Sequence, residues 1–511
     1  MISSANADVA TVDVSNADLA NLDLANLDLS PAEMRAMGEA VVARAVEHLA
    51  TLREQPSRGD FTEIEAMCRA MREPVPEQGT ALEPLLGQLF DEWIPRSFTT
   101  PGPGYFAYIP GGGIYPAALA DFIANATNRY TGIWQAAPAL VQLEANVLEW
   151  LRDWMQFPAT TRGLFTTGGS MAMFNAIACA REKHLGDDIR SGTLYVSSQA
   201  HHCIVKAAKL AGIAHDRVRT VGVDGDFRIR VDELERAIAA DRAAGLKPFM
   251  VFSSAGTTNT GAVDMIDAVA DVAARERLWH HVDGAYGAFF HMVPELRPLL
   301  RGLPRADSLT LDPHKGMFLP YGTGALLVRD GEALRALHSS TAGYLPANQD
   351  EFYDPAQYGP ELSRGFPGLR VWLTVKIFGA AKYRAAVAEK RELAVWAAEQ
   401  VARIPGIVMD APPQLSLFAF HVTGRGIDTL AQQNAATQAL MERVTRRGDV
   451  MLTGAMVGDR YLGRVCVLSF RTRRADVDVC VRQIAEETAA LLAALLADPD
   501  RLEPTVTGGH G

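Results

Sequence analysis

Between about residues 160 and 330, short apolar runs alternate with stretches of helical periodicity. The runs are GLFTT, TLYVSS, FMVFSS, LWHHVD and SLTLD, and amphipathic segments such as SMAMFNAIACAREKH and MIDAVADVAARER separate several of them. This alternation predicts βαβ units, that is, a mostly parallel sheet with helices on both faces. Ligands of such sheets bind at the carboxyl ends of the strands, so functional residues are expected directly after each apolar run.

The pattern changes on both sides of this α/β region. Ser30, Pro31 and Glu33 form a helix-start signal before an apolar stripe, which predicts a helical N-terminal segment. Strand and helix patterns alternate again after about residue 396, which suits a smaller α+β domain. The predicted parts are a tail (1–30), a helical segment (31–100), a large domain (101–395), a small C-terminal domain (396–495) and a second tail (496–511).

The first thirty residues carry a five-residue period, ANADV ATVDV SNADL ANLDL ANLDL. This period resembles a fragment of a pentapeptide-repeat solenoid. Five copies of so short a unit bury little apolar surface, so we interpret the segment as a flexible or loosely docked tail.

Composition narrows the class of protein. A chain of 511 residues with 48% apolar residues can fill more than one core, and its net charge of −11 includes no basic block, which disfavours nucleic acid as a partner. The five scattered cysteines never form a CxxC pair, which favours reduced thiols and a cytoplasmic protein. No membrane span or signal peptide is recognisable, so no membrane partner is expected.

Unusual residues follow four of the runs. Gly168, Gly169 and Ser170 stand between a strand and a helix, where free amides favour a phosphate, although Gly-Gly-Ser is also ordinary punctuation of such a turn. His201 and His202 follow the next run, and because adjacent residues on a helix point in different directions, at most one of them faces a ligand.

Asp283 and Lys315 follow two further strand patterns. Asp283 comes directly after LWHHV, where a carboxylate serves as a metal ligand, a helix cap or the partner of a protonated ring nitrogen. Lys315 lies in LDPHKGMFLPYGTGALLV, a setting too rich in glycine and proline for an ordinary solvated helix. A nucleophilic lysine needs desolvation or an adjacent aldehyde to lose its charge. A phosphate cradle, an acid, a stacking imidazole and an amine are together the groups that pyridoxal 5'-phosphate (PLP) requires.

From about Leu29 to Leu495, the chain resembles the PLP-dependent group II decarboxylases, the aromatic L-amino acid decarboxylase-like family of fold type I. The matching motifs are TTGGS, QAHHCIVKAA, AGTTNTGAVD, HVDGAYG, LDPHKG, PGYFAYIPGGG, GIWQAAPALVQLE and ELSRGFPGLRVWLTVKIFG. The resemblance implies an α/β fold of the PLP-dependent transferase type and a covalent bond between Lys315 and the cofactor. It also implies that Asp283 binds the ring nitrogen, that His201 stacks on the ring, and that further contacts come from Gly169, Ser170, Thr258, Ala285 and His314.

The resemblance further implies decarboxylation of an L-amino acid by a homodimer whose site lies at the subunit interface. A loop tyrosine returns a proton to Cα in this family, and Tyr353 and Tyr358 are the candidates, with Tyr358 favoured by its distance from ELSR. Gly365 and Met173 depart from the family pattern, in which an arginine and an asparagine are frequent. An aromatic substrate is expected because corresponding segments line the substrate pocket of relatives, although these aromatics could instead fill the core: Tyr105, Phe106, Tyr130 and Trp134.

Three alternatives remain. Relatives that lack the tyrosine or the stacking histidine tend toward oxygen-dependent production of an aldehyde, so an aldehyde synthase, or another lyase of this fold, is the nearest alternative. A metal hydrolase would instead use His201, His202, His280, His281 and Asp283, but adjacent histidines rarely bind one ion together. A non-catalytic binding protein of this fold is disfavoured by the presence of Lys315, Asp283 and His201.

Overall fold

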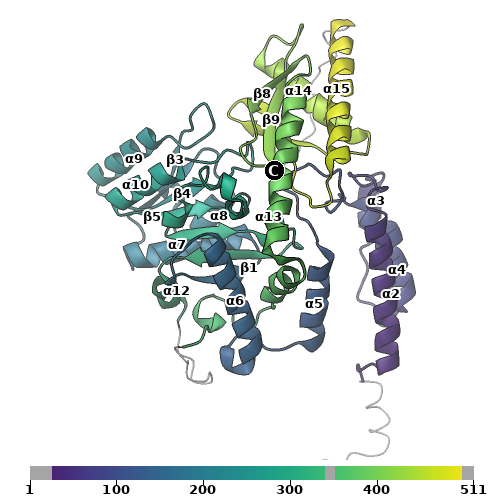
Figure 1. Cartoon of the computed structure of the whole chain (residues 1–511), viewed down its shortest axis with the longest axis horizontal. Helices are drawn as coiled ribbons and strands as arrows, with labels where there is room; N and C mark the ends of the chain where they lie inside the picture. The colour runs from purple at the N-terminus through teal and green to yellow at the C-terminus, as the bar shows by residue number, and fades with distance from the viewer. Residues whose placement is uncertain (1–25, 340–350, 498–511) are drawn as a thin grey trace, which may run out of the picture. The chain divides into compact units, whose positions relative to one another are not determined.

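The computed structural model describes residues 26–339 and 351–497 in two compact units. Of these described residues, 26–51 and Asp60–Ser97 form the first unit, and Leu52–Gly59 with 98–339 and 351–497 form the second (Figure 1). Nearly all of the two predicted tails lies outside the described residues. The predicted division of the chain at residues 30, 100, 395 and 495 stays a prediction.

The first unit begins with helix α2 (Pro31–Ala50), whose start confirms the signal in the sequence. Ser30 Oγ accepts a hydrogen bond from the Glu33 amide, and the Glu33 carboxylate accepts one from the Ser30 amide, which completes a capping box. The other helices of this unit are α3 (Ile64–Ala70), α4 (Leu82–Gly87), η2 (Gln88–Trp93) and η3 (Ile94–Arg96).

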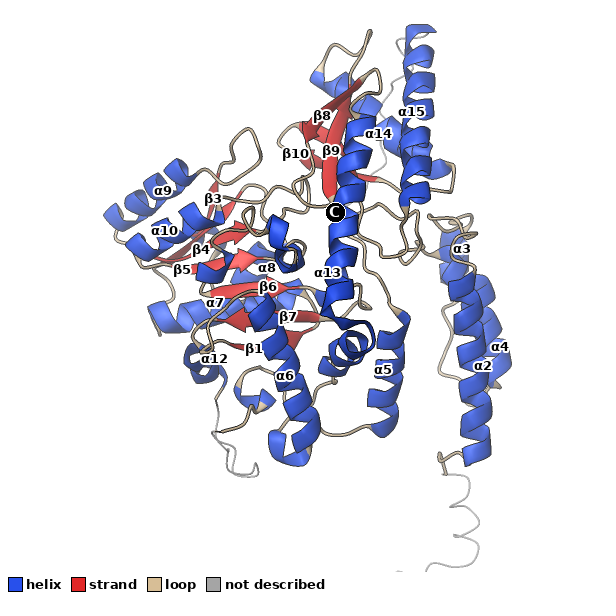
Figure 2. Ribbon diagram, in the orientation of Figure 1, coloured by secondary structure: helices blue, strands red, loops and turns tan. Residues whose placement is uncertain are grey.

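The second unit is built around a seven-stranded sheet with the order β1-β7-β6-β5-β4-β2-β3 (Figure 2). Five of its strands run parallel from β6 to β3, and β7 pairs antiparallel with both β6 and β1. The mostly parallel α/β sheet predicted from the sequence is therefore confirmed. The strands are β1 (Arg162–Thr166), β2 (Gly192–Ser197), β3 (Val218–Val221), β4 (Lys247–Ser254), β5 (Trp279–Asp283), β6 (Ser308–Leu311) and β7 (Gly324–Val328).

Both faces of this sheet are buried, as the continuous apolar runs require. Along β7, Leu326 and Val328 pack into one cluster with α7 and α8, whereas Ala325 and Leu327 pack into another with α6 and α13. Successive strand residues point to opposite faces, so one strand supplies both cores. The helices that contact the sheet or each other here are α5 (Tyr115–Thr127), α6 (Pro138–Trp154), α7 (Gly169–Leu185), α8 (Cys203–Leu210), α9 (Val231–Ala243), α10 (Ile266–Glu276) and α12 (Gly331–His338).

The long helix α13 (Gly368–Val401) connects this sheet with a second one (Figure 1). Gly379, with a φ of 77°, kinks the helix, a backbone conformation that glycine adopts without strain. The second sheet is antiparallel, in the order β10-β11-β9-β8. Its elements are β8 (Ile407–Ala411), β9 (Leu417–Val422), α14 (Leu430–Arg446), β10 (Thr453–Val457), β11 (Arg460–Cys466) and α15 (Arg474–Ala497).

The remaining elements are short. They are α11 (Pro313–Gly316), η4 (Trp134–Ala136), η5 (His215–Arg217), η6 (Ala288–Met292), η7 (Pro294–Leu296), η8 (Leu303–Arg305) and η9 (Pro355–Gln357). Among the described residues, none of the helices combines the length and the apolar character that a membrane crossing needs.

Candidate active site

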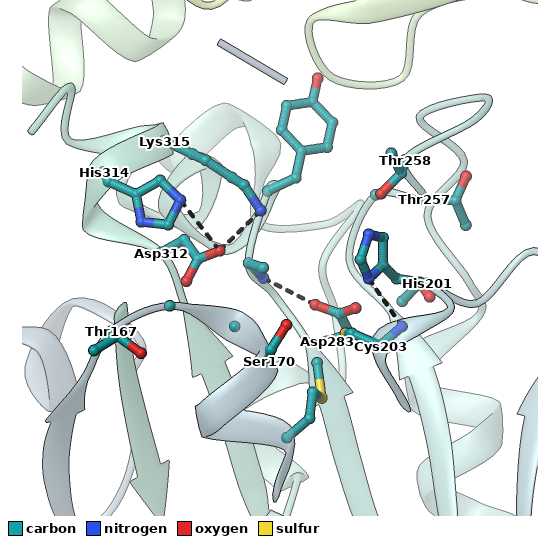
Figure 3. A pocket seen from close by; sticks show the side chains of 17 residues that line it. Thr167, Ser170, His201, Cys203, Thr257, Thr258, Asp283, Asp312, His314 and Lys315 are labelled. Carbon is teal, nitrogen blue, oxygen red and sulfur yellow. Dashed lines mark hydrogen bonds and ion pairs between the residues drawn. The ribbon is translucent and has the colours of Figure 1, made fainter. Parts of the chain in front are cut away.

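The carboxyl ends of the parallel strands meet at one edge of the large sheet, where they open onto a cavity of about 390 Å³ (Figure 3). The ends of β1, β2, β4, β5 and β6 each contribute a residue or a turn named in the sequence analysis. The eight residues expected to bind the cofactor all line this cavity: Gly169, Ser170, His201, Thr258, Asp283, Ala285, His314 and Lys315. The structure therefore brings together side chains that are separated by more than a hundred residues in the chain.

Lys315 stands on the single turn of helix α11, directly after β6. Its Nζ lies 2.8 Å from Oδ2 of Asp312, three residues earlier, and the Asp312 side chain is only 2% exposed. Burial lowers the pKa of Lys315, but the carboxylates of Asp312 and Asp283 outweigh burial and leave it raised. The amine is thus held as a cation in an ion pair with a buried carboxylate.

Asp312 is a site residue that sequence reasoning missed. It follows the apolar run SLTL in the same way that Asp283 follows LWHHV, so the same signal would have found it. Its second oxygen, Oδ1, is buried and has no hydrogen-bond partner in the described structure. A buried carboxylate oxygen without a partner is unusual and marks a place where a ligand atom is expected.

Asp283 ends strand β5, where its partly buried side chain lines the cavity. Its Oδ1 accepts a hydrogen bond from the Ala285 amide at 3.1 Å, which fixes the carboxylate at the turn after the strand. Burial raises the pKa of Asp283, while Lys315 and the Ala285 amide act in the opposite direction. A carboxylate in such a place gains stability from a cationic partner such as a protonated ring nitrogen.

His201 lies at the start of α8, on the side of the cavity opposite Lys315 (Figure 3). Its Nδ1 accepts a hydrogen bond from the Cys203 amide at 3.3 Å, so the neutral ring carries its proton on Nε2. Burial, with the nearby His202 and Lys315, lowers the pKa of His201 to about 4. The ring is therefore neutral at pH 7 and presents a flat apolar face suited to stacking. Of the two adjacent histidines, only His201 lines the cavity.

The glycine turn before α7 forms a cradle with little room for side chains. A Cβ on Gly169 would lie 3.2 Å from Asp312 Oδ2, and Gly168 has a φ of 151° that favours glycine. The first amides of an α-helix have no acceptor within the helix, and the helix dipole favours an anion beside them. Ser170 and His314 also face this turn (Figure 3). The turn suits a phosphate group.

The turn that carries Thr258 is held by an arginine from the second sheet, another residue that sequence reasoning missed. Arg464 on β11 donates to the carbonyl oxygens of Thr258 and Asn259, the latter at 3.0 Å. Its side chain is 3% exposed, and its hydrogen bonds to carbonyls give the charge local partners. No motif in the sequence indicated this role, because the contact joins residues about two hundred positions apart.

The groups that line the cavity are those that PLP requires. The cavity holds an amine, a buried carboxylate, a flat neutral imidazole and a glycine cradle at a helix start, and its size suits a small aromatic cofactor. Cys203 lines the cavity as well, and burial raises the pKa of its thiol to about 12, so the thiol remains protonated and unreactive.

The two candidate tyrosines lie outside the cavity of Lys315 within the same chain. Tyr353 and Tyr358 stack on each other with ring centroids 5.1 Å apart and line a second cavity of about 160 Å³. Tyr353 Oη donates to the Gly163 carbonyl at 3.1 Å. Neither ring lines the cavity of Lys315 within one chain, and the catalytic role of each stays a prediction.

The four aromatics expected in a substrate pocket also lie outside this cavity. Phe106, 1% exposed, packs in the apolar cluster of the second sheet, and Tyr105, 3% exposed, packs against Met451. Trp134 stacks on Phe352, and Tyr130 is 41% exposed. Within one chain, Phe106 and Tyr105 therefore fill apolar cores, which is the second interpretation given in the sequence analysis.

The histidine cluster of the metal-hydrolase alternative is dispersed. His280 Nε2 pairs with Ser253 Oγ at 2.8 Å, and both ring nitrogens of His281 pair with hydroxyls of β6. Within residues 26–339 and 351–497, no three His, Cys, Asp or Glu side chains are grouped so that they could hold a metal ion. The geometry gives no support to this alternative.

Comparison with known proteins agrees with the geometry. Residues 65–423, more than half of the chain, match the family described as the pyridoxal-dependent decarboxylase conserved domain. An aromatic-L-amino-acid decarboxylase of Bacillus atrophaeus is 32% identical over 90% of this chain and 97% of its own length.

Solved structures are similar along nearly the whole chain. The Oryza sativa TDC with PLP and tryptamine superimposes with a TM-score of 0.87 at 26% identity, covering 91% of this chain and all of that one. The Rhodiola rosea 4-hydroxyphenylacetaldehyde synthase gives 0.84 at 25% identity, covering 91% of this chain and 99% of that one. With the cavity around Lys315 and the family match over residues 65–423, the chain belongs to the pyridoxal-dependent decarboxylase family, whose cofactor is PLP.

Proposed function

We propose that this protein decarboxylates an aromatic L-amino acid to the corresponding amine and carbon dioxide. The observation that carries the proposal is the cavity in which Lys315, Asp283 and His201 meet at the strand ends. The aromatic substrate class is supported by the similarity to an aromatic-L-amino-acid decarboxylase and to tryptophan and tyrosine decarboxylases. When bound, PLP supplies an aldehyde for an amine and a protonated ring that accepts electrons from a bond broken at Cα.

Each residue has a separate role in this proposal. Lys315 provides the amine that holds the cofactor, and Asp283 keeps the ring nitrogen protonated from below the cavity. His201 stacks its neutral ring on the cofactor ring, and Ala285 limits the space on the other side. Gly169 and Ser170 bind the phosphate, and Thr258 and His314, which line the same cavity, make supporting contacts.

Tyr358 is the proposed donor of the proton to Cα. The hydroxyl of Tyr353 already donates to the Gly163 carbonyl, which makes Tyr353 the weaker candidate. Because Tyr358 lines a different cavity from Lys315 in its own chain, the proposal requires that it serves the cavity of a second subunit. The substrate-pocket aromatics Tyr130 and Trp134 are assigned to the same subunit interface.

A homodimer is therefore part of the proposal. Helix α2 supports it, because five of its apolar side chains are 40–50% exposed: Met34, Met37, Val41, Val42 and Val46. Exposed apolar rows of this kind mark interaction surfaces. Sedimentation equilibrium should give a dimer, and a monomer at all concentrations would contradict this part. We also propose a cytoplasmic location, since all five cysteines are free.

The nearest alternative is an aldehyde synthase. It is supported by the similarity to the Rhodiola rosea 4-hydroxyphenylacetaldehyde synthase. One assay separates the two reactions. Purified protein is incubated with tyrosine, tryptophan, dopa or phenylalanine, and carbon dioxide, amine, aldehyde, ammonia and peroxide are measured together. The proposal expects carbon dioxide and amine in equal amounts, with a Lys315→Ala variant as the inactive control. Aldehyde with ammonia and peroxide would instead support the synthase.

A further inference from the structure

Four side chains with polar groups form a buried polar row across strands β5 and β6. Trp279 and His281 alternate along β5, and Ser308 and Thr310 alternate along β6, so each pair points to a single face of the sheet. None of the four is more than 2% exposed. Trp279 Nε1 and His281 Nδ1 each lie 2.7 Å from Ser308 Oγ. His281 Nε2 lies 3.1 Å from Thr310 Oγ1, so the contacts run without a gap from one end of the row to the other.

The polar row ends on Met173, a residue of α7 that lines the cavity. Thr310 Oγ1 donates to Met173 Sδ at 3.7 Å, and the methionine is 1% exposed. Thr310 also packs against the glycine cradle, because its Cγ2 is 3.6 Å from the position that a Cβ on Gly169 would occupy. Thr310 is not among the described residues that line the cavity, so it reaches the cofactor site only through its neighbours.

The direction of each hydrogen bond in the polar row follows from the contact with Met173. A thioether sulfur has no proton to give, so the single hydroxyl proton of Thr310 is used there. Toward His281, Thr310 then only accepts, and His281 therefore carries its proton on Nε2. Burial lowers the pKa of His281 to about 3, so the ring is neutral at pH 7 and its Nδ1 accepts from Ser308. The Trp279 N–H, which only donates, binds the Ser308 oxygen.

The opposite tautomer of His281 satisfies fewer groups. A proton on Nδ1 would turn the Thr310 hydroxyl toward Nε2 and leave the Met173 sulfur without a donor. It would also leave the Ser308 hydroxyl without an acceptor in the polar row, and a buried hydroxyl that makes no hydrogen bond is costly. The ring of Phe252 lies 5.1 Å from the imidazole, measured between centroids, and covers it with an apolar group.

We propose that the polar row holds the Met173 thioether in one orientation in the cavity wall, so that His281 and Thr310 are positioning residues for PLP. Methionine is unbranched and flexible, and without a partner its side chain adopts several shapes. A wall that is already ordered in the empty cavity loses less entropy when the cofactor binds. The inference rests on the assignment of PLP to this cavity and not on the substrate proposed above.

The test compares two changes at Thr310 that separate its hydroxyl from its methyl group. Thr310→Val keeps the shape and loses the hydroxyl, whereas Thr310→Ser keeps the hydroxyl. Binding of PLP to the apoprotein is measured by titration of the visible absorbance. Thr310→Val should raise the apparent Kd for PLP about two- to tenfold, which corresponds to immobilising one flexible side chain on binding. Thr310→Ser should restore binding to within about twofold of wild type.

The same comparison in a Met173→Leu background shows whether the effect passes through the sulfur. Leucine accepts no hydrogen bond, so Thr310→Val should change the apparent Kd by less than about twofold in that background. An equal effect of Thr310→Val in both backgrounds would overturn the inference, and so would an unchanged Kd in the single variant. Circular dichroism checks that each variant is folded.

A second measurement reads the orientation of Met173 without the cofactor. In NMR spectra of apoprotein with isotope-labelled methionine methyl groups, the Met173 signal is assigned by its absence in Met173→Leu. It should report one ordered side-chain conformation in wild type and in Thr310→Ser, and averaging over several in Thr310→Val. A mobile Met173 methyl group in wild type would contradict the inference even if Thr310→Val did not fold. If wild type binds no PLP at all, the cofactor assignment fails instead, so the two failures are distinguishable.

Discussion

Arg364 Nη1 lies 2.5 Å from Oε1 of Glu144, and this ion pair joins the segment before α13 to helix α6 inside the protein. Oε2 of the same carboxylate accepts a hydrogen bond from the Gly368 amide at 3.1 Å, so both oxygens are used. The side chains are 9% and 1% exposed. The arginine of the ELSRG motif thus fixes the start of the helix that reaches both sheets.

We expect Glu144→Gln to lower the free energy of unfolding by about 3–5 kcal/mol, because it leaves the Arg364 charge buried without a counterion. Urea unfolding measures this change. Asp478→Asn is the matched control, since it breaks an exposed ion pair to Arg474 and should change stability by less than about 0.5 kcal/mol. Equal effects of the two variants would show that burial of the pair is unimportant.

Stability should fall in mild acid because of two buried histidines. Burial lowers the pKa of His280 and of His281 to about 3, below the value of 6.5 for an exposed histidine. Protonation therefore favours the unfolded chain, and the free energy of unfolding decreases as the pH falls from about 6.5 toward 3. At pH 5 each histidine should account for about 2 kcal/mol of this loss.

The corresponding variant is His280→Asn, measured by urea unfolding at pH 7 and pH 5. It removes one titrating group, so the loss of stability between the two pH values should be smaller than in wild type by about 2 kcal/mol. His215→Asn, at an exposed position, should leave the loss unchanged. An unchanged loss in His280→Asn would mean that this histidine is already charged in the folded protein.

Phe106 should determine stability and not substrate choice. Because it is 1% exposed within the core of the second sheet, Phe106→Ala should destabilise the protein by about 3–5 kcal/mol. Phe106→Leu fills most of the space and is expected to keep the ranking of aromatic substrates, measured as kcat/KM for tyrosine and tryptophan. A reversed ranking in the leucine variant would return Phe106 to the substrate pocket.

Tyr358→Phe and Tyr353→Phe form a matched pair for the proton donor. We expect Tyr358→Phe to convert the product from amine to aldehyde with uptake of oxygen, because the proton no longer returns to Cα. Tyr353→Phe loses a hydrogen bond to Gly163, so it should cost about 1 kcal/mol of stability and still give amine. Product analysis by mass spectrometry decides, and amine from both variants would exclude Tyr358.

Local signals in the sequence were sufficient for the secondary structure and for much of the site. The capping box at Ser30 and Glu33 and the apolar runs of the large sheet act over a few residues, and the structure shows the helix and the mostly parallel sheet that they predicted. Because parallel strands end at one edge, the chemistry after each run also had to converge, and Lys315, Asp283 and His201 do line one cavity.

Other features depend on contacts that no local pattern encodes. The sequence could not reveal that Arg464 holds the turn of Thr258, and it left both a pocket and a core position open for Phe106, because both depend on the packing of distant segments. The pairing of Asp312 with Lys315 was within reach at a spacing of three residues, yet its burial comes from the fold. The sequence determined which groups lie at the strand ends, and the tertiary structure decided their burial and partners, since desolvation and charge depend on all the surrounding segments.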